Sequence, residues 1–216
     1  MSLELIIGPM FAGKTSALQS IIRRHEALGM PCIAYKPLLD DRQGTEEYMQ
    51  THDGVKVSAR RTASLKTEEL SDDYIRSKLI VIEEGQFFPD LYRFVMKAVE
   101  TDKKNVVVAG LDGDRFRKPF GQLLELIPIA DRVTKLTSLC KLCANGTVAL
   151  FSYCDTSSTD IVHVGGIEKY MPLCRAHYLK SVAIAKGDCP NCAEALIGSV
   201  YRPRCSKCPW DSDCCK

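Results

Sequence analysis

No apolar run in the sequence approaches the length of a membrane span, and the first residues carry no signal-peptide pattern. Neither sign of charge dominates, because 29 Lys and Arg residues stand against 27 Asp and Glu residues, which leaves a formal net charge of +2. This balance gives no electrostatic argument for a nucleic-acid or membrane partner. With 45% hydrophobic and 26% charged residues, the composition is that of an ordinary globular chain, and we expect a cytoplasmic protein.

Cysteine is nearly absent from the first part of the chain and abundant afterwards. Of the 11 cysteines, only Cys32 precedes position 140. Disulfides are rare in a reducing compartment, so clustered cysteine pairs favour metal binding. A chain of 216 residues has room for one domain and a small appendage. We therefore expect the cysteine-poor and cysteine-rich parts to be different structural units.

The cysteine-poor part alternates between strand and helix patterns. Four short apolar runs are typical of buried strands: 3–7, 32–36, 79–82 and 106–109. Apolar residues at helical spacing follow the first run, from Thr15 to a stop at Gly29, and recur over 91–99. Residues 40–72 are polar and carry few structural signals. The alternation predicts an α/β fold with a parallel sheet.

The first apolar run leads directly into G-P-M-F-A-G-K-T, which fits the phosphate-binding pattern G-x-x-x-x-G-K-[ST]. Glycines in such a loop let backbone N–H groups surround phosphate oxygens, and the following helix N-terminus adds a favourable dipole. The lysine would reach the β- and γ-phosphates, while the threonine hydroxyl would ligate Mg²⁺. The pattern thus predicts a site for ATP and Mg²⁺ formed by Gly8, Pro9, Met10, Phe11, Ala12, Gly13, Lys14 and Thr15.

Two carboxylates, Glu83 and Glu84, follow the apolar run 79–82. P-loop enzymes use an acidic residue at the end of another buried strand to hold Mg²⁺. Neighbouring residues of a strand point to opposite sides, so one carboxylate can face the metal and the other the phosphoryl acceptor. These features alone do not separate a kinase from an ATPase or GTPase.

Four sequence blocks, in order, make the pattern more specific. Residues 83–91, E-E-G-Q-F-F-P-D-L, resemble the D-E-G-Q-F-F-P-D-[IL] segment of thymidine kinases of the class shared by vertebrate cytosolic, poxviral and many bacterial enzymes. The P-loop with its Met-Phe pair, A-G-L-D-G-D-R-F-R-K-P-F-G at 109–121 and G-G-I-E-K-Y-M-P-L-C-R-A-H-Y at 165–178 resemble three further blocks. The resemblance implies a P-loop kinase-like parallel sheet with helices on both faces. It also implies transfer of the γ-phosphoryl group of ATP to the 5′-hydroxyl of thymidine.

The resemblance assigns roles to the reacting groups. Glu84 falls on the catalytic base, which accepts the proton of the hydroxyl, and Glu83 falls where the family usually has its Mg²⁺-associated aspartate. The segment D-D-R resembles the family's D-x-R, which places Asp40 in the ATP–Mg²⁺ site. Arg42 would stabilise charge on the transferring phosphoryl group, a task that suits a guanidinium. Together with Lys14, Glu84 and Arg42 form the expected catalytic set.

The resemblance also implies a nucleoside pocket with aromatic and apolar walls, formed by Met10, Phe87, Leu111, Phe120, Gly165 and Tyr170. Two departures from the family pattern leave the nucleoside selectivity open. The family phenylalanine after L-D-G-x aligns with Arg115, and Phe116 follows one place later. Residues 149–152 match the family's A-x-x-[ST] only with a short insertion.

Two cysteine patterns predict structural zinc, for which thiolate and imidazole donors are suited. The first, C-x₂-C…C-x₂-H, comprises Cys140, Cys143, Cys174 and His177, and the resemblance places it at the base of a loop that closes over the nucleoside. The second, C-x₂-C-x₁₂-C-x₂-C, is a four-thiolate ribbon pattern beyond the family match, comprising Cys189, Cys192, Cys205 and Cys208. No role follows for Cys154, Cys214 and Cys215.

We therefore expect a P-loop kinase domain at 1–138, a zinc-tethered lasso at 139–186 that binds the nucleoside, and a ribbon at 187–216. The leading interpretation is a thymidine kinase of nucleotide salvage. The resemblance further implies a homotetramer inhibited by thymidine triphosphate. The alternative is a P-loop ATPase coupled to a nucleic-acid-binding ribbon, because basic and aromatic residues accompany it: Lys186, Tyr201, Arg202, Arg204, Lys207 and Trp210. A third interpretation makes the tail only a stability or assembly element.

Overall fold

A six-stranded parallel sheet forms the centre of the computed structural model, which describes residues 1–38, 48–50, 54–154, 170–199 and 202–209. Each neighbouring pair of strands runs parallel, as predicted. The order across the sheet is β5 (Arg60–Thr62), β2 (Cys32–Pro37), β6 (Leu79–Ile82), β7 (Asn105–Gly110), β1 (Ser2–Ile7) and β8 (Arg132–Lys135). The four predicted strands are thus confirmed as the four inner ones.

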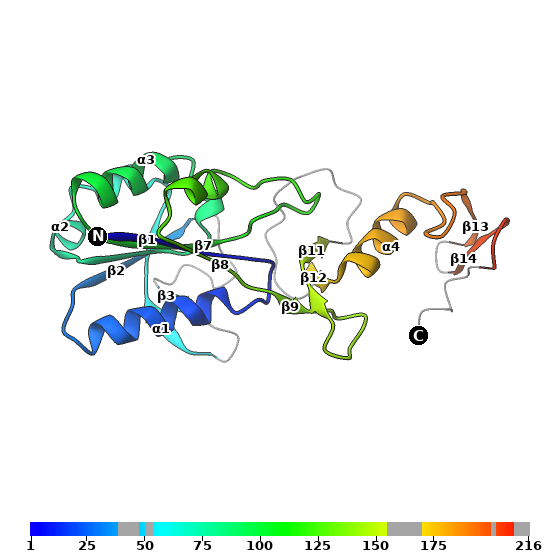
Figure 1. Ribbon diagram of the computed structural model, residues 1–216, viewed down its shortest axis with the longest axis horizontal. Helices are drawn as coiled ribbons and strands as arrows, with labels where there is room; N and C mark the ends of the chain where they lie inside the picture. The colour runs from blue at the N-terminus through cyan, green and yellow to red at the C-terminus, as the bar shows by residue number, and fades with distance from the viewer. Residues whose placement is uncertain (39–47, 51–53, 155–169, 200–201, 210–216) are drawn as a thin grey trace.

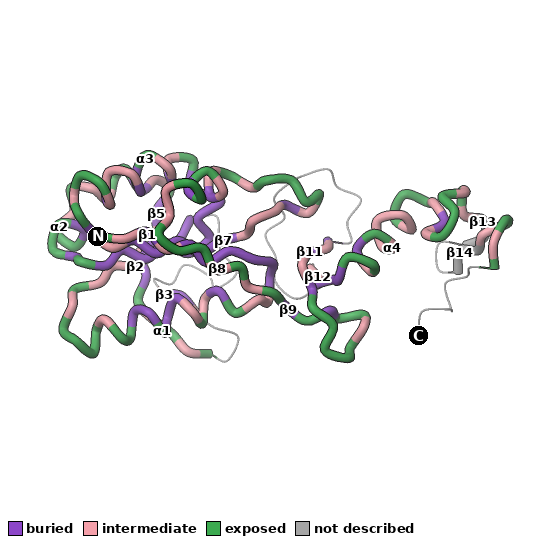
Figure 2. Tube along the Cα trace, in the orientation of Figure 1, coloured by how far each residue is buried: buried purple, intermediate pink, exposed green. Residues whose placement is uncertain are grey.

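Helices cover both faces of this sheet, which confirms the predicted architecture (Figure 1). Successive residues of β1 divide between the two faces. Leu5 belongs to the core cluster that contains Phe94 of α3 (Leu91–Met96), whereas Ile6 belongs to the cluster that contains Leu18 of α1 (Lys14–Glu26). Burial on both sides explains why the inner strands are continuously apolar. Figure 2 shows the buried residues concentrated along these strands.

The helices begin and end near their sequence signals. Ser71 caps α2 (Asp72–Arg76), because its hydroxyl accepts a 3.2 Å hydrogen bond from the backbone N–H of Tyr74. After α1, Gly29 takes a φ of 67° and turns the chain towards β2. The predicted helix over 91–99 is α3 followed by a π-helical turn, η3 (Lys97–Thr101). Three short 3₁₀ helices complete this part: η1 (Leu65–Glu68), η2 (Gly85–Phe87) and η4 (Leu123–Ile129).

The sequence patterns missed the edges of the sheet. In the described part of the chain, β5 and β8 are the outer strands of the sheet. Both carry polar residues, so neither has a continuous apolar run. A small hairpin, β3 (Tyr48–Gln50) with β4 (Lys56–Ser58), also lies in the polar stretch that predicted no element.

The cysteine-rich part extends beyond one end of the sheet (Figure 1). Its elements are β9 (Ser138–Leu139), β10 (Val148–Ala149), β11 (Phe151–Cys154), β12 (Tyr170–Leu173), α4 (Arg175–Ala185), β13 (Leu196–Ser199) and β14 (Arg202–Cys205). Ala149, Leu173 and Tyr178 belong to a core cluster of its own. Within the described ranges, no helix has the length and apolar character needed to cross a membrane.

We expect Phe94→Ala to lower the free energy of unfolding by about 3–5 kcal/mol, because it empties a packed site in the core. The Phe94 side chain is fully buried, and its ring centroid lies 6.2 Å from that of Tyr35 and 5.6 Å from that of Tyr74. Urea denaturation followed by circular dichroism measures the loss. Leu70→Ala is the control, because Leu70 is 87% exposed, and we expect a change within about 0.5 kcal/mol. Similar losses in both variants would contradict this account of the core.

Candidate functional site

The P-loop connects β1 to α1 and folds around the side chain of Lys14. The loop starts with a 3.3 Å hydrogen bond from the N–H of Gly8 to the carbonyl of Gly110 at the end of β7. Phe11 and Gly13 take positive φ angles of 62° and 82°, which turn the chain into the helix. The Lys14 ammonium donates to the carbonyls of Gly8 at 3.1 Å and Pro9 at 2.8 Å, so it lies across its own loop.

The two carboxylates after β6 are buried and have different partners. Glu83 is 5% exposed, and its Oε1 accepts a 2.6 Å hydrogen bond from the hydroxyl of Thr15. Glu84 is 9% exposed, and its Oε2 accepts a 2.7 Å hydrogen bond from the amide of Gln86. Glu83 therefore contacts the P-loop, whereas Glu84 contacts the turn that follows β6. The Glu84 backbone is left-handed, with a φ of 50°, which is uncommon for a residue with a side chain.

The parallel sheet brings these segments to one edge. β1, β7 and β6 are consecutive in the sheet order, so the residues after their carboxyl ends are neighbours. Leu111, just after β7, donates its backbone N–H to the Gln86 side chain at 3.0 Å. Ligands of open parallel sheets bind outside the carboxyl ends of the strands, where this site lies.

The expected pocket residues fall into two groups. Phe87 and Phe120 meet edge to face, with ring centroids 5.4 Å apart, and both are half-buried, as is Leu111. Tyr170 lies on β12, paired with Cys154 of β11, in the cysteine-rich part of the chain. Asp40, Arg42 and Gly165 lie outside the described residues.

Arg115 and Phe116, where the sequence departs from the family pattern, contact each other. The Arg115 guanidinium lies 5.1 Å from the ring centroid of Phe116, and Phe116 is 46% exposed. The aromatic ring that follows one place later than in the family pattern is therefore half-exposed.

Among the described residues, hydrogen bonds connect the cysteine-rich part to loops that follow the strands of the sheet. The N–H of Met10 in the P-loop donates to the hydroxyl of Ser152 on β11 at 2.9 Å, and both residues are buried. The Tyr178 hydroxyl on α4 donates to the carbonyl of Arg115 at 2.6 Å. Burial raises the pKa of Tyr178, which favours the protonated form that this bond requires.

Sequence reasoning gave no role to Gln86 or Tyr178, although both lie inside the family blocks. Ser152 was part of the A-x-x-[ST] match at 149–152, which needed a short insertion. The signal for Gln86 was an amide side chain two positions after Glu84 and directly before a pair of phenylalanines. Its partners could be identified only once the neighbouring strands were known.

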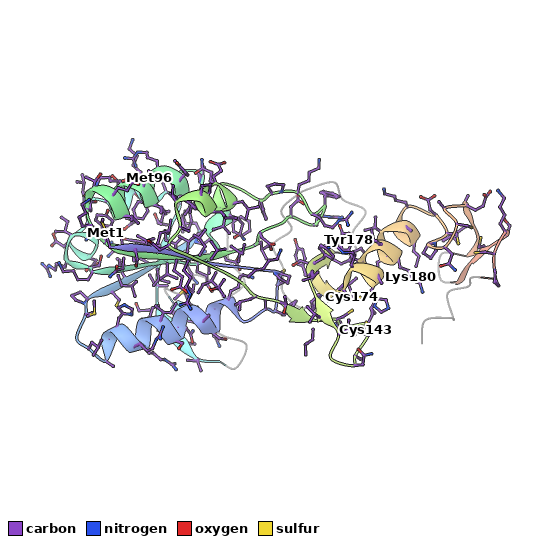
Figure 3. The ribbon with its side chains drawn as sticks, viewed as in Figure 1. Met1, Met96, Cys143, Cys174, Tyr178 and Lys180 are labelled. Atoms are coloured by element: carbon purple, nitrogen blue, oxygen red, sulfur yellow. The ribbon has the colours of Figure 1, made fainter. Side chains whose placement is uncertain are left out.

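The first cysteine cluster has the dimensions of a tetrahedral metal site. Its four ligand atoms all lie within 4.8 Å of one another. The Nδ1 atom of His177 is 3.2 Å from the sulfur of Cys143 and 3.4 Å from those of Cys140 and Cys174. Zn–S and Zn–N bonds of about 2.3 and 2.1 Å give sulfur–nitrogen edges of about 3.5 Å. Figure 3 shows Cys143 and Cys174 near the start of α4, next to Tyr178.

The second cluster has four sulfur donors and is more exposed. Cys189 is buried, Cys192 is exposed, and Cys205 and Cys208 are half-buried. Sulfur atoms lie 3.5 Å apart between Cys189 and Cys208, and 3.4 Å apart between Cys192 and Cys205. A four-thiolate zinc site has sulfur–sulfur edges of about 3.8 Å, so this geometry also fits the metal.

In each cluster one thiol ionises readily. Desolvation opposes ionisation of Cys140, but backbone N–H groups of Cys174 and Cys143 and the side chain of His177 outweigh it, and the pKa falls to about 6. The backbone N–H of Lys207 is the main cause that lowers the pKa of Cys205 to about 6. A thiolate is the form of cysteine that ligates metal, so one of the four donors in each cluster reaches the ligating form more readily than an ordinary thiol.

We expect Ser152→Ala to destabilise the protein by about 1–3 kcal/mol, because the buried N–H of Met10 loses its hydrogen-bond acceptor. Ser152→Thr, which keeps the hydroxyl, is the matched variant and should retain more of the stability. Chemical denaturation of both variants and the wild type measures the difference. Equal stability of Ser152→Ala and the wild type would contradict the importance of this contact.

Comparison with known proteins places the chain in a family. The thymidine kinase family model matches residues 1–178. The thymidine kinase of Oryza sativa subsp. japonica is 42% identical over 181 residues, which cover 82% of this chain and 66% of the rice protein. Thymidine kinase a of Arabidopsis thaliana is 38% identical, covering 87% of this chain and 79% of its own. The thymidine kinase of myxoma virus (strain Lausanne) is 39% identical, and the match covers 82% of this chain and 95% of the viral protein. The chain therefore belongs to the thymidine kinase family.

Proposed function

We propose that this protein transfers the γ-phosphoryl group of ATP to the 5′-hydroxyl of thymidine, giving thymidine monophosphate. The observation that carries the proposal is the hydrogen bond from Thr15 to Glu83, with the Glu84 carboxylate next in the chain. A P-loop hydroxyl paired with an acidic strand end is the arrangement that holds Mg²⁺ in phosphoryl-transfer enzymes. Membership in the thymidine kinase family supports thymidine as the acceptor.

Each reacting group then has a distinct task. The P-loop N–H groups and Lys14 would bind the triphosphate, with Thr15 and Glu83 holding Mg²⁺, which neutralises phosphate charge when bound. Glu84 would orient the 5′-hydroxyl and accept its proton as the new bond forms. Asp40 and Arg42 are proposed for the same site on the family motif alone, because both lie outside the described residues.

The pocket that we propose for the nucleoside combines the two groups of residues around the strand ends. Met10 is 8% exposed, and its N–H connects the P-loop to Ser152 of the cysteine-rich part. At this junction Met10 would contact the nucleoside beside the phosphates, as the family motif implies. The Phe87–Phe120 pair and Leu111 would form the apolar wall on the side of the sheet. Tyr170 and Gly165 would contribute from the cysteine-rich part, as the family motif implies.

We further propose structural zinc in both clusters: one ion held by Cys140, Cys143, Cys174 and His177, and one by Cys189, Cys192, Cys205 and Cys208. On this basis the chain divides into a P-loop kinase domain at 1–138, a zinc-tethered nucleoside-binding lasso at 139–186 and a zinc ribbon at 187–216. The separate core cluster of the lasso supports the first boundary. We also propose, on the family resemblance, a cytoplasmic homotetramer that thymidine triphosphate inhibits.

Thymidine-dependent ATP consumption tests the function. We expect the wild type to produce ADP only when a nucleoside is present, and Glu84→Gln to lower kcat by about 10²–10⁴-fold, because the general base is lost. A panel of thymidine, deoxyuridine and deoxycytidine defines the selectivity that the Arg115 departure leaves open. Glu125→Gln is the matched control, because Glu125 is an exposed glutamate on η4, and its kcat should equal that of the wild type.

ATP hydrolysis that DNA or RNA stimulates without any nucleoside would contradict the kinase and favour the ATPase with a nucleic-acid-binding ribbon. Deletion of 187–216 distinguishes a ribbon that binds nucleic acid from a tail with only a structural role. An ATPase of that kind would lose its stimulation with the ribbon, whereas a kinase should keep its dependence on thymidine.

Metal analysis tests the two clusters. We expect about two zinc ions per purified chain, and about one in either Cys140→Ser or Cys205→Ser, because each variant removes a ligand from one cluster. Plasma mass spectrometry of the protein after gel filtration measures the content. Cys32→Ser is the control, because Cys32 lies on β2 outside both clusters and should leave the zinc content unchanged. A wild-type content in Cys205→Ser would contradict the second site.

A further inference from the structure

The side chain of Gln86 lies between the proposed base and the proposed nucleoside pocket. Its amide nitrogen donates to Oε2 of Glu84 at 2.7 Å, and its amide oxygen accepts from the backbone N–H of Leu111 at 3.0 Å. Gln86 is 4% exposed, so water does not compete for either bond. One amide thus connects the end of β6 to the end of β7.

The chemistry of the two partners determines how this amide is oriented. A backbone N–H can only donate, so the group that faces Leu111 must be the amide oxygen. The NH₂ group must then face Glu84, where an ionised carboxylate is the natural acceptor. Gln86 therefore favours the charged form of Glu84, which is the form that can accept a proton.

Two glycines pack directly against Gln86 and restrict its movement. A Cβ on Gly110 would lie 2.3 Å from the Gln86 Oε1 atom, and a Cβ on Gly121 would lie 2.2 Å from the Gln86 carbonyl oxygen. Both distances are far below van der Waals contact. A side chain at position 121 would collide with the Gln86 backbone, and one at position 110 would displace the Gln86 side chain itself. Gly121 also has a φ of 58°, which suits glycine. The family blocks at 83–91 and 109–121 thus meet at this one residue.

We propose that Gln86 is a positioning residue that aims the Glu84 carboxylate at the acceptor hydroxyl and fixes it relative to Leu111. This inference rests on the proposed function, in which Glu84 is the base. Glu84 needs such support because its backbone is left-handed and its side chain must keep one direction to meet the substrate. A proton acceptor works only within hydrogen-bond reach of its proton, and a displacement of about 1 Å can reduce the rate about 100-fold.

Gln86→Leu tests the proposal, because leucine fills similar space but makes neither hydrogen bond. We expect kcat to fall about 10–100-fold while KM for ATP changes less than about twofold, since the P-loop contacts are unaltered. Rates are normalised to the concentration of ATP-binding sites, so a partly unfolded sample does not imitate a slow enzyme. Gln122→Leu is the matched control, because the Gln122 side chain accepts from the N–H of Tyr92 at 3.0 Å and belongs to neither proposed site. That variant should keep the wild-type kcat.

A double-mutant cycle shows whether Gln86 acts through Glu84. If it does, Glu84→Gln combined with Gln86→Leu will be no slower than Glu84→Gln alone. The proposal would be overturned if the two substitutions lowered kcat by independent factors that multiply in the double variant. A wild-type kcat in Gln86→Leu would also overturn it. Should Gln86→Leu fail to fold, Gln86→Glu serves instead: it keeps an acceptor for Leu111 but turns a carboxylate oxygen towards Glu84. We expect at least the same fall in kcat, and a wild-type value would overturn the proposal.

The outcomes also separate this inference from the function on which it depends. A wild-type protein that fails to phosphorylate thymidine, or a Glu84→Gln variant with full activity, would refute the proposed function itself. An active wild type, an impaired Glu84→Gln variant and an unimpaired Gln86→Leu variant would refute only the role of Gln86.

Discussion

The site depends on the hydrogen bond between Thr15 and Glu83, which joins two segments that the sheet keeps apart. Thr15 follows β1 and Glu83 follows β6, and β7 lies between these strands. The bond forms because all three strands run parallel and end at one edge, where the P-loop can reach across β7. The same edge carries Leu111 and Gln86, so the proposed phosphate site and the proposed acceptor site lie on one framework of strands. Catalytic groups on strand ends are held more precisely than groups on loops.

Much of the fold could be predicted from the sequence, because the inner strands are buried on both faces. Such strands must be apolar along their whole length, and their short runs between helical patterns are distinctive. The edge strands β5 and β8 lack this signal, because each pairs with one strand among those described and their residues are largely polar. Helix α4 lacks a signal for another reason: its apolar residues are spread around the helix, and only Tyr178 is buried.

The site was predictable where the chemistry depends on spacing along the chain. The P-loop is one continuous segment, and each cysteine cluster consists of paired candidate ligands a few residues apart. Contacts between strands are different, because they depend on which strands become neighbours. Gln86 meets Leu111, 25 positions away, only because β6 pairs with β7. The packing of Gly121 against Gln86 likewise has no local signature, although the family blocks contain both residues.

The family match ends at Tyr178, in the middle of α4, which continues to Ala185. The last seven residues of the helix extend about 10 Å beyond that point at the usual rise per residue. The second cysteine cluster begins at Cys189, directly after hydrogen bonds from Lys186, Gly187 and Asp188 to the last turn of α4. The described part of the tail, 187–199 and 202–209, is therefore connected to α4 by backbone hydrogen bonds, and its direction depends on the helix that carries His177.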